Sequence, residues 1–424
     1  MKTFKLYTLG CKVNQYESQE IREQLLRLGF AQSNNGKKAD LYLINTCTVT
    51  GKADSDSLRF IRRAVRENPD ARIIVTGCLT ELDAKRIKEL SGKKLIIRNK
   101  DKAHILKFLK LPDELNGLNA SGISDFSGHT RAFLKIQDGC NNFCSYCKVP
   151  LVRGRSRSRK PAEIIAEAGR LAESGFKEIV LTGICLGAYG KDLHPKSNLT
   201  QIIKKLIKID SLKRIRLSSI EAGDVTSGLI KLMAGSGKIC RHLHIPIQSG
   251  DDRILRSMRR SYTHAGYLKL IRKIKAKVPG IAITTDCLVG FPGEGKENFF
   301  NTVKLVKEIL PLRVHIFPYS PRKGTKAFGN KETLPAKEMR ERTALLRKVS
   351  QECAQKFQKL FSGKEAQVLI ESRDKDNPGF WQGHTDNYLK VLVKSRLNLH
   401  NKMVKVKLRD LSIDNYFFAK YNEV

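Results

Sequence analysis

The sequence predicts an α/β protein made of an N-terminal parallel sheet, a central partial (β/α) barrel of the TIM type and a small C-terminal antiparallel β-barrel. Apolar runs of strand length alternate with helical patterns over residues 1–111 and again over residues 131–360. Short alternating runs, separated by Asn, Gly and Asp, fill residues 361–424. A chain of 424 residues is also too long for one compact core, so several domains are expected.

The N-terminal part, residues 1–111, shows the pattern of βαβ units on a parallel sheet. Its strands are expected at Phe4–Leu9, Leu41–Ile44 and Ile73–Thr76, with helices that include Ser18–Leu28 and Asp54–Arg66. Residues 112–130 are rich in Gly, Asn and Ser, which predicts a linker.

The central part, residues 131–360, repeats a strand and helix pattern six times. Its strands are expected at Ala132–Gln137, Glu178–Thr182, Ile215–Ser219, His242–Ile247, Ile281–Val289 and Val314–Tyr319. Functional residues of such a barrel lie at the carboxyl ends of the strands. In the C-terminal part, strands are expected at Ala366–Ile370, Tyr388–Val393, Met403–Leu408 and Tyr416–Ala419.

The net charge of the chain, 79 − 42 = +37, favours a polyanionic partner, and a nucleic acid is the first candidate. Lysines dispersed for solubility alone are the alternative, but two stretches without acids, residues 148–160 and 253–277, carry six and nine basic residues. The N-terminus lacks a signal peptide and no run of eighteen apolar residues occurs, so a soluble cytoplasmic protein without a membrane partner is expected. Ten cysteines in such a protein favour metal or redox chemistry over disulfides.

The first cysteine set is Cys140, Cys144 and Cys147, directly after the first expected barrel strand. Three thiolates at this spacing can hold three irons of a 4Fe-4S cluster and leave the fourth iron open to a ligand. A structural zinc site is the alternative, but it requires a fourth Cys or His nearby, and residues 148–160 contain neither. The spacing therefore favours a cluster with one open iron.

The second set is Cys11, Cys47 and Cys78, each of which stands directly after an expected strand. The carboxyl ends of parallel strands share one edge, so these distant thiols are expected to converge there on a second cluster. Gly10 and Gly77 would let the backbone approach a bulky group. Each thiol alone could be an ordinary buried cysteine, as we expect for Cys240 and Cys353.

Longer segments resemble the radical SAM methylthiotransferase family, SAM being S-adenosylmethionine, over essentially the whole chain. They point to the branch acting on N6-threonylcarbamoyladenosine in tRNA, and they are Thr8–Ser18, Asn45–Thr50, Ile136–Cys147, Arg153–Arg159, His244–Gly250, Asp286–Glu294 and Phe317–Ser320. The resemblance implies an N-terminal cluster domain, a radical SAM barrel and a C-terminal TRAM domain, for which Thr385–Val391 is the best match.

The resemblance also implies a mechanism with two 4Fe-4S clusters. One SAM would methylate a sulfur held at the cluster of Cys11, Cys47 and Cys78. A second SAM, at the cluster of Cys140, Cys144 and Cys147, would be cleaved to a 5′-deoxyadenosyl radical that removes hydrogen from carbon 2 of adenine. A positioned radical suits an unactivated aromatic C–H bond, which acid–base chemistry does not. The implied partners are a tRNA anticodon loop and an electron donor of the flavodoxin or ferredoxin type.

Further contacts follow from strand-end position and from the resemblance, with core packing as the alternative for each. The expected SAM contacts are Tyr146, Thr182, Gly183, Ser219, Gln248 and Val289. Cys185 stands where family members usually have Asn, and Cys287 replaces an aliphatic residue, so a polar contact from position 185 is in doubt.

RNA contacts are expected from an arginine run and from two aromatic residues. The run alternates with Gly and Ser, which suits phosphate contacts, although a solvated basic loop is the alternative. The expected contacts are Arg153, Arg155, Arg157, Arg159, Trp381 and Tyr388. Stacking on aromatic rings would read a splayed base, while core packing is the alternative for the two aromatic residues.

Two other functions compete with this interpretation. The same chemistry could act on isopentenyladenosine in tRNA or on an aspartate of a ribosomal protein. A non-catalytic iron–sulfur protein that binds RNA is the rival from another class, and formation of 5′-deoxyadenosine from SAM on reduction would exclude it.

Overall fold

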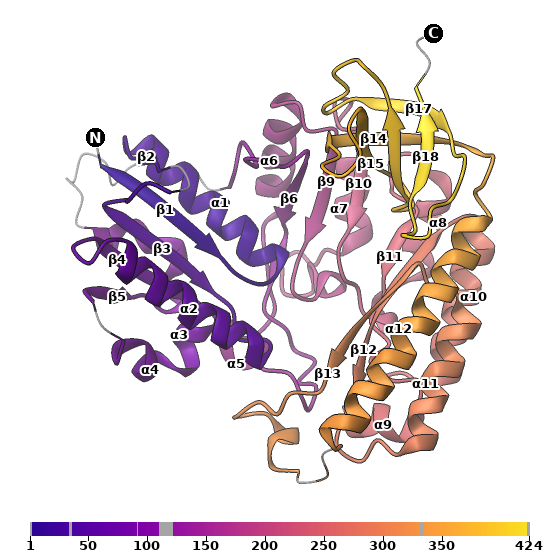
Figure 1. The fold of residues 1–424 in the computed structure, drawn as a ribbon, viewed down its shortest axis with the longest axis horizontal. Helices are drawn as coiled ribbons and strands as arrows, with labels where there is room; N and C mark the ends of the chain where they lie inside the picture. Colours follow the sequence, from indigo (N-terminus) through magenta and orange to yellow (C-terminus); the bar gives the residue numbers. More distant parts are fainter. Residues whose placement is uncertain are drawn as a thin grey trace.

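The computed structural model describes residues 2–33, 36–90, 92–109, 122–330, 332 and 334–421. The N-terminal domain lies beside the central barrel, and the C-terminal domain lies at one end of that barrel (Figure 1). No helix of the described residues has the length and apolar character needed to cross a membrane.

The N-terminal domain is a five-stranded parallel sheet in the order β2-β1-β3-β4-β5. This strand order is that of flavodoxin-like folds, in which ligands bind at the switch point between the first and third strands. Its elements are β1 (Thr3–Thr8), α1 (Lys12–Arg27), β2 (Ala31–Gln32), β3 (Leu41–Thr46), α2 (Gly51–Glu67), β4 (Arg72–Gly77), α3 (Leu79–Leu82), α4 (Ala84–Lys88), β5 (Lys94–Ile96) and the 3-10 helix η1 (Asn99–Leu109).

The three expected strands are confirmed, but both helices begin earlier than predicted. Helix α1 starts at Lys12, directly after Cys11, and α2 starts after Thr50, whose hydroxyl accepts the N–H of Ala53. Residues 112–121 of the expected linker lie outside the described part of the chain. The linker prediction is wrong for residues 122–130, because Ile123 and Phe126 are buried in the core of the barrel.

The central domain is a partial barrel of six parallel strands in the order β6-β9-β10-β11-β12-β13, as predicted. Bridges between residues 215 and 239 and between Ser219 and His244 join its two halves. The elements are β6 (Arg131–Lys135), β7 (Gln137–Asp138), α5 (Val149–Arg153), β8 (Arg157–Ser158), α6 (Pro161–Glu173), β9 (Glu178–Thr182), η3 (Leu186–Ala188), α7 (Leu199–Leu206), β10 (Arg214–Leu217), η4 (Ala222–Asp224), α8 (Ser227–Gly235), β11 (His242–His244), α9 (Asp252–Ser257), α10 (His264–Lys277), β12 (Ala282–Val289), α11 (Lys296–Ile309), β13 (Arg313–Pro318), η5 (Lys326–Gly329) and α12 (Ala336–Lys359).

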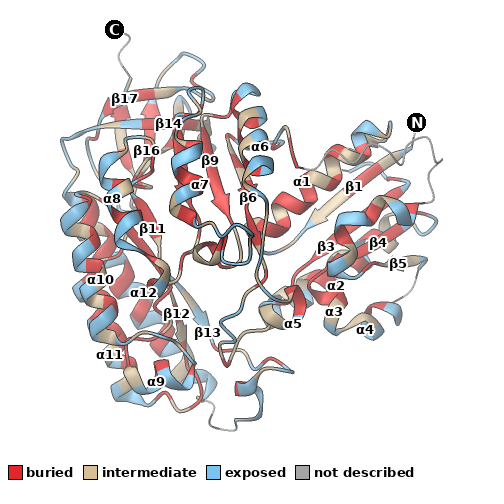
Figure 2. Cartoon of the chain, turned by 180° about the vertical axis from the view of Figure 1, so that it is seen from behind, coloured by how far each residue is buried: buried red, intermediate tan, exposed pale blue. Residues whose placement is uncertain are grey.

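The barrel is open between its edge strands β6 and β13. Strands β9 and β10 are buried along their whole length, whereas much of β13 is exposed (Figure 2). The N-terminal domain docks on both edges: α1 packs against β6, and Arg322, which follows β13, donates to the carbonyl of Thr48 at 2.9 Å and to Asp54 at 2.5 Å. The N-terminal domain therefore spans the opening.

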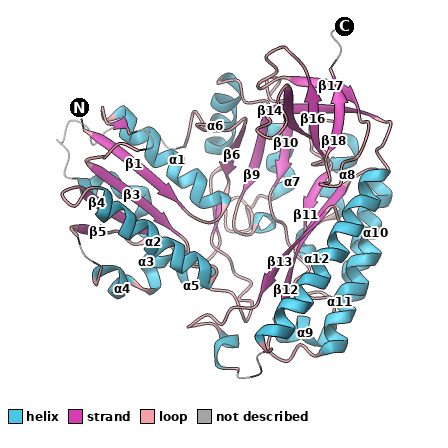
Figure 3. Ribbon diagram, viewed as in Figure 1, coloured by secondary structure: helices cyan, strands magenta, loops and turns pink. Residues whose placement is uncertain are grey.

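The C-terminal domain is a curled sheet in the order β17-β14-β15-β16-β18, in which every pair is antiparallel except β16 with β18 (Figure 3). Its strands are β14 (Glu365–Arg373), β15 (Phe380–Thr385), β16 (Lys390–Lys394), β17 (Met403–Lys407) and β18 (Phe417–Lys420). Strand β15 was not predicted, because its buried position 383 is a glycine, whose absent Cβ leaves room for the Leu369 carbonyl and weakens the apolar alternation. Arg214 and Arg216 donate to carbonyls of this domain and fix it at the amino ends of the barrel strands.

Candidate functional site

The cysteines of the N-terminal domain converge, as predicted, at the carboxyl ends of β1, β3 and β4. A Cβ placed on Gly10 would lie only 2.6 Å from Sγ of Cys47, so the loop that carries Cys11 passes directly over this thiol. The backbone N–H of Cys78 donates to the Thr46 carbonyl at 3.1 Å. Burial raises the pKa of Cys47 to about 11, and the neighbouring thiols of Cys78 and Cys11 add to that rise.

The two glycines beside these cysteines allow loops of the protein to lie close together, and their predicted role beside a cluster stays a prediction. Both have positive φ values, 90° at Gly10 and 99° at Gly77. Gly10 leaves room for the Cys47 side chain, and a Cβ on Gly77 would lie 2.4 Å from the carbonyl oxygen of Thr46. The close approach is therefore between loops of the protein itself.

A network of buried amides and hydroxyls holds the strand ends in place behind the thiols. Asn14 donates to the carbonyls of Leu9 at 2.7 Å and Thr46 at 2.9 Å, which ties the Cys11 loop to the Cys47 loop. Asn45 donates in turn to the Asn14 carbonyl at 3.0 Å. The polar residues of the Thr8–Ser18 segment therefore position the cysteines.

The second cysteine set lies in the loop after β7, at the carboxyl end of the barrel, and each of its sulfurs accepts one N–H hydrogen bond. Cys140 accepts from the Asn142 backbone at 3.4 Å and Cys147 from the Val149 backbone at 3.5 Å. Cys144 accepts from the Arg260 guanidinium at 3.3 Å. This donor pattern suits sulfurs that carry negative charge as metal ligands.

Arg260 and Cys185 belong to the barrel site, but the sequence did not single out Arg260. Arg260 also pairs with Glu221, which fixes the guanidinium against Cys144. Cys185 is buried beside Cys140 and helps to lower the pKa of Cys140 to about 7, while its own Sγ donates to Asp224 Oδ2 at 3.9 Å. Arg260 is one of nine basic residues in the stretch 253–277, and nothing in the local sequence indicates that it contacts Cys144 and Glu221.

A buried ion network, which we call the Glu17 network, joins the two cysteine sets. Glu17 of α1 accepts from Lys102 at 2.7 Å, from Lys135 at 2.7 Å and from Arg153 at 3.2 Å. Asp138 accepts from Arg153 at 2.8 Å. The three cations hold the pKa of the Glu17 carboxyl well below its usual range despite burial, and Arg153 also lies within electrostatic reach of Cys78 and Cys11.

The net charge of the Glu17 network is positive, with three cations against two carboxylates. Arg153 ends α5, whose following residue Gly154 accepts the Cys140 N–H at 3.1 Å. The same arginine thus contacts the loop of one cysteine set and faces the other. An excess of buried positive charge beside both sets suits groups with anionic thiolate ligands.

The predicted SAM contacts lie at the same end of the barrel as Cys140, in different settings. Thr182 is buried and its hydroxyl donates back to Val180, while Gly183 packs against Gln137. Ser219 and Gln248 are partly exposed, and Val289 is buried at the end of β12. Tyr146 packs edge-to-face on Phe291, with ring centroids 6.4 Å apart. Cys287, the other departure from the family pattern, is a core residue.

The structure separates the predicted RNA contacts into buried and exposed groups. The prediction for Arg153 is wrong, because its side chain is buried and paired with Glu17 and Asp138. Arg159 pairs with Glu167 at 2.7 Å. Arg155 and Arg157 are exposed and stay candidates for phosphate contacts.

The two aromatic candidates also differ. Trp381 is only 5% exposed in the core of the C-terminal domain, which contradicts its predicted contact with RNA. Tyr388 is half-buried where the C-terminal domain meets the barrel, and Arg216 lies 4.2 Å from its ring centroid. Tyr388 also lines a cavity of about 410 Å³ beneath the open edge of the barrel.

The cysteine sets fit iron–sulfur clusters better than single zinc ions. Four thiolates around one zinc ion, each about 2.3 Å from the metal, lie within about 4 Å of one another. Among the described residues, only His244, Asp286 and His315 bring three metal-binding atoms of His, Cys, Asp or Glu within 4.8 Å of one another, so neither cysteine set does. In each cysteine set at least one pair of sulfurs therefore lies more than 4.8 Å apart, and this separation, the N–H donors on the barrel sulfurs and the positive Glu17 network together suit a larger anionic group.

Comparisons with known proteins agree with this arrangement. Residues 134–306 match the model of the Radical SAM superfamily, and residues 3–97 match that of the Uncharacterized protein family UPF0004. Threonylcarbamoyladenosine tRNA methylthiotransferase MtaB of Bacillus subtilis is 38% identical over 96% of this chain and 94% of its own. The Chlamydia pneumoniae protein of that name is 38% identical over 87% of each chain. tRNA-2-methylthio-N(6)-dimethylallyladenosine synthase of Clostridium tetani is 33% identical over 96% of this chain and 93% of its own.

Solved structures share the fold at low sequence identity. The radical S-adenosylmethionine methyltransferase TsrM of Kitasatospora setae has a TM-score of 0.56 at 14% identity, covering 77% of this chain and 76% of its own. The cobalamin-dependent S-adenosylmethionine radical enzyme OxsB has a TM-score of 0.52 at 14% identity, covering 80% and 56%. With relatives of 38% identity across nearly its full length and a radical SAM barrel at its centre, the chain belongs to the radical SAM methylthiotransferase family.

Proposed function

We propose that the enzyme converts N6-threonylcarbamoyladenosine in the anticodon loop of tRNA to its 2-methylthio form. The observation that carries the proposal is the pair of three-cysteine sets, one in each of two docked domains, in a chain that resembles curated threonylcarbamoyladenosine enzymes from end to end. Relatives named for dimethylallyladenosine are nearly as similar, at 33–35% identity, so that nucleoside is the second candidate acceptor.

A radical SAM methylthiotransferase uses a 4Fe-4S cluster and SAM, and Cys140, Cys144 and Cys147 would hold that cluster. Cluster and SAM together supply a radical able to remove an unactivated hydrogen atom. The residues of the chain hold the cluster thiols and SAM in position. Arg260 and two backbone N–H groups fix the barrel thiols, and the strand ends of β9, β10, β11 and β12 provide the surface on which SAM would lie.

A second cluster at Cys11, Cys47 and Cys78 is part of the proposal, and its support is the convergence of the three thiols. Because the sulfur donor and the radical must meet at one adenine, the two domains have to be held at a fixed separation. The Glu17 network and the Arg322 contact with Asp54 provide two such points of attachment. Arg155 and Arg157 would contact phosphates, and an electron donor of the flavodoxin or ferredoxin type would reduce the barrel cluster.

Nucleoside analysis tests the acceptor. The anaerobically reconstituted enzyme, with SAM and a reductant, is given tRNA that contains either threonylcarbamoyladenosine or dimethylallyladenosine, and the digested nucleosides are measured by mass spectrometry. We expect the methylthio form of threonylcarbamoyladenosine and 5′-deoxyadenosine. A methylthio product of dimethylallyladenosine alone would overturn the acceptor assignment, and absence of 5′-deoxyadenosine would favour the non-catalytic alternative.

A further inference from the structure

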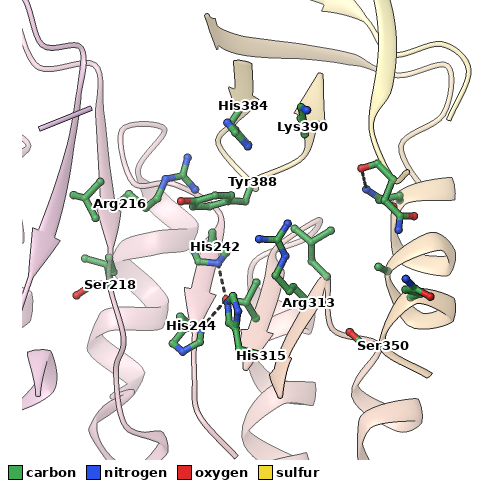
Figure 4. Close-up of a pocket in the computed structure, with 18 of the residues that line it drawn as sticks. Arg216, Ser218, His242, His244, Arg313, His315, Ser350, His384, Tyr388 and Lys390 are labelled. Carbon is green, nitrogen blue, oxygen red and sulfur yellow. Dashed lines mark hydrogen bonds between the residues drawn. The ribbon is translucent and has the colours of Figure 1, made fainter. Parts of the chain in front are cut away.

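The cavity of about 410 Å³ lies where all three domains meet. Lys12 contributes from the N-terminal domain, Arg313 and His315 from edge strand β13, and Tyr388 and Lys390 from the C-terminal domain. Figure 4 shows side chains from β10, β11, β13 and the C-terminal domain around one shared space. Because Lys12 directly follows Cys11, the cavity borders the residue next to the N-terminal cysteine set.

Two cations of this cavity have no acidic partner among the described residues. Neither Lys12 nor Arg313 lies within 4.0 Å of a carboxylate, whereas Arg216 pairs with Glu178 at 2.6 Å and Lys390 lies 3.9 Å from Asp374. Lys12 is close enough to Tyr388 to help lower the pKa of that phenol. Lys12 is also the first residue of α1, so the positive end of the helix dipole adds to its charge. This part of the cavity therefore favours an anion.

The deeper wall of the cavity offers a hydrogen-bond acceptor. His244 lies with Nε2 at 3.2 Å from Asp286 and Nδ1 at 2.9 Å from the Thr284 hydroxyl, and His242 Nε2 lies 2.9 Å from the same hydroxyl. With a neutral His244 whose Nε2 donates to the Asp286 carboxylate, His244 Nδ1 accepts from Thr284, and Thr284 accepts from His242 Nε2. Burial lowers the pKa of His242 well below its usual value, so the ring is neutral.

The chain of bonds leaves His242 Nδ1 with a free lone pair. Only 6% of His242 is exposed, and its Nδ1 has no hydrogen-bond partner among the described residues. A buried acceptor without a protein partner costs free energy, and a ligand that supplies a donor can remove this cost. The ligand should therefore carry an N–H or O–H group as well as a negative charge.

We propose that this cavity is the specificity site for the threonylcarbamoyl group of the substrate nucleoside: Lys12 and Arg313 bind its carboxylate, and His242 Nδ1 accepts a hydrogen bond from its hydroxyl or carbamoyl N–H. This inference rests on the proposed function and assigns the residues that read the acceptor. A dimethylallyl group has neither a carboxylate nor a donor, so it would leave the two cations and the acceptor unsatisfied. The site would thus separate the two nucleosides on which the relatives act.

Binding to two matched RNAs tests the proposal apart from turnover. Anticodon stem–loop RNAs carrying threonylcarbamoyladenosine or plain adenosine at the same position are titrated into the reconstituted enzyme, and the ratio of the two Kd values gives the preference for the modified base. Lys12→Met and Arg313→Met should each reduce this preference about tenfold, because each removes one charge-assisted contact of roughly 1.5 kcal/mol. Lys231→Met, which removes one exposed cation on α8, should weaken both RNAs equally and leave the ratio unchanged.

Substitutions of His242 test the acceptor. His242→Leu removes it and should also reduce the preference about tenfold, whereas His242→Asn places an amide oxygen near the position of Nδ1 and should restore most of it. An unchanged preference in the Lys12, Arg313 and His242→Leu variants, or no preference in the wild type, would overturn the site assignment. If the wild type methylthiolates threonylcarbamoyladenosine but the variants keep its preference, only this inference fails. If the wild type does not modify that nucleoside, the proposed function fails and this inference with it.

Discussion

Glu17→Gln is expected to destabilise the contact between the N-terminal domain and the barrel strongly, because it removes one of two carboxylates that balance three cations. The wild-type Glu17 network has a net charge of +1, and the variant would have +2 in the same buried space. Removing one partner of a buried ion pair costs about 3–5 kcal/mol. The residual hydrogen bonds of the glutamine amide offset little of this, so we expect about 3 kcal/mol.

Urea unfolding of the apo protein measures this effect with two probes. Far-UV circular dichroism follows the helices of the N-terminal domain and barrel, while fluorescence of the single tryptophan, Trp381, follows the C-terminal domain. The circular dichroism transition should move to lower urea and the Trp381 transition should move less. Glu20→Gln is the matched control, because burial raises the pKa of Glu20, which lies one turn further along α1, and a neutral side chain there should not destabilise.

The pH dependence of stability tests independently whether ionised Glu17 stabilises the folded protein. The pKa of Glu17 is lower in the folded state than in the unfolded chain, where a glutamate has a pKa of about 4.3. Its contribution to stability is therefore present above about pH 4 and is lost as the pH falls below that value. The difference between wild type and Glu17→Gln should shrink in acid. A difference under about 1 kcal/mol at pH 7, or one that grows in acid, would refute this account of the network.

Three further changes have defined outcomes. Cys185→Ala should leave the iron content of the reconstituted enzyme unchanged, because Cys185 belongs to neither three-cysteine set and its Sγ donates to Asp224, whereas Cys144→Ala should remove about one cluster; iron and sulfide analysis would show it. Glu294→Gln should remove a loss of stability between about pH 4 and 7 seen by thermal unfolding, since burial raises the pKa of Glu294 to about 7 and its ionised form is disfavoured in the folded state. The double variant Arg155→Ala and Arg157→Ala should reduce the slope of the logarithm of the tRNA binding constant against the logarithm of salt concentration by about the amount expected for two lost phosphate contacts. An unchanged slope would contradict a role of these arginines in binding phosphate.

The arrangement of strands and the two cysteine sets could be predicted from the sequence, because strand ends carry a local signal. Each cysteine follows an apolar run, and parallel pairing then brings the ends of neighbouring strands together. The start of α1 was placed six residues late, because Val13 and Tyr16 are its only apolar residues before Ser18, too few to extend the helical pattern of Ser18–Leu28.

Pairings between domains could not be predicted in this way. Glu17 and Arg153 are 136 residues apart, and nothing in the alternation of Arg with Gly and Ser distinguishes the buried Arg153 from the exposed Arg155. The structural reason is that Arg153 ends helix α5, which turns its side chain toward α1, while Arg155 follows in the loop. The same holds for Arg260, whose partners Cys144 and Glu221 come from other strands' loops.

The cavity did leave a signal in the sequence, in the alternation along the barrel strands. The interior of a closed TIM barrel is filled with Val, Ile and Leu, but here the inward positions are polar. Arg216 on β10 and Ser218 directly after it line the cavity and alternate with the core residues Ile215 and Leu217, and on β11 His242 and His244 flank the core residue Leu243. A barrel of six strands has room for such residues because it never closes between β6 and β13.

The polar residues inside the barrel and its open edge are therefore structurally linked. Arg216 and His242 are already buried, and bonds of Arg216 to Glu178 and of His242 Nε2 to Thr284 offset the cost of about 1–3 kcal/mol that an unsatisfied buried group carries. The open edge leaves His244 partly exposed and Arg313 and His315 exposed, so a ligand of matching charge can reach them. The N-terminal domain, docked across the opening by Glu17 and Arg322, places Lys12 at the mouth of the same cavity. Recognition of the substrate substituent and the separation of the two cysteine sets would then depend on one domain contact, so a variant that loosens this contact should lose selectivity together with turnover.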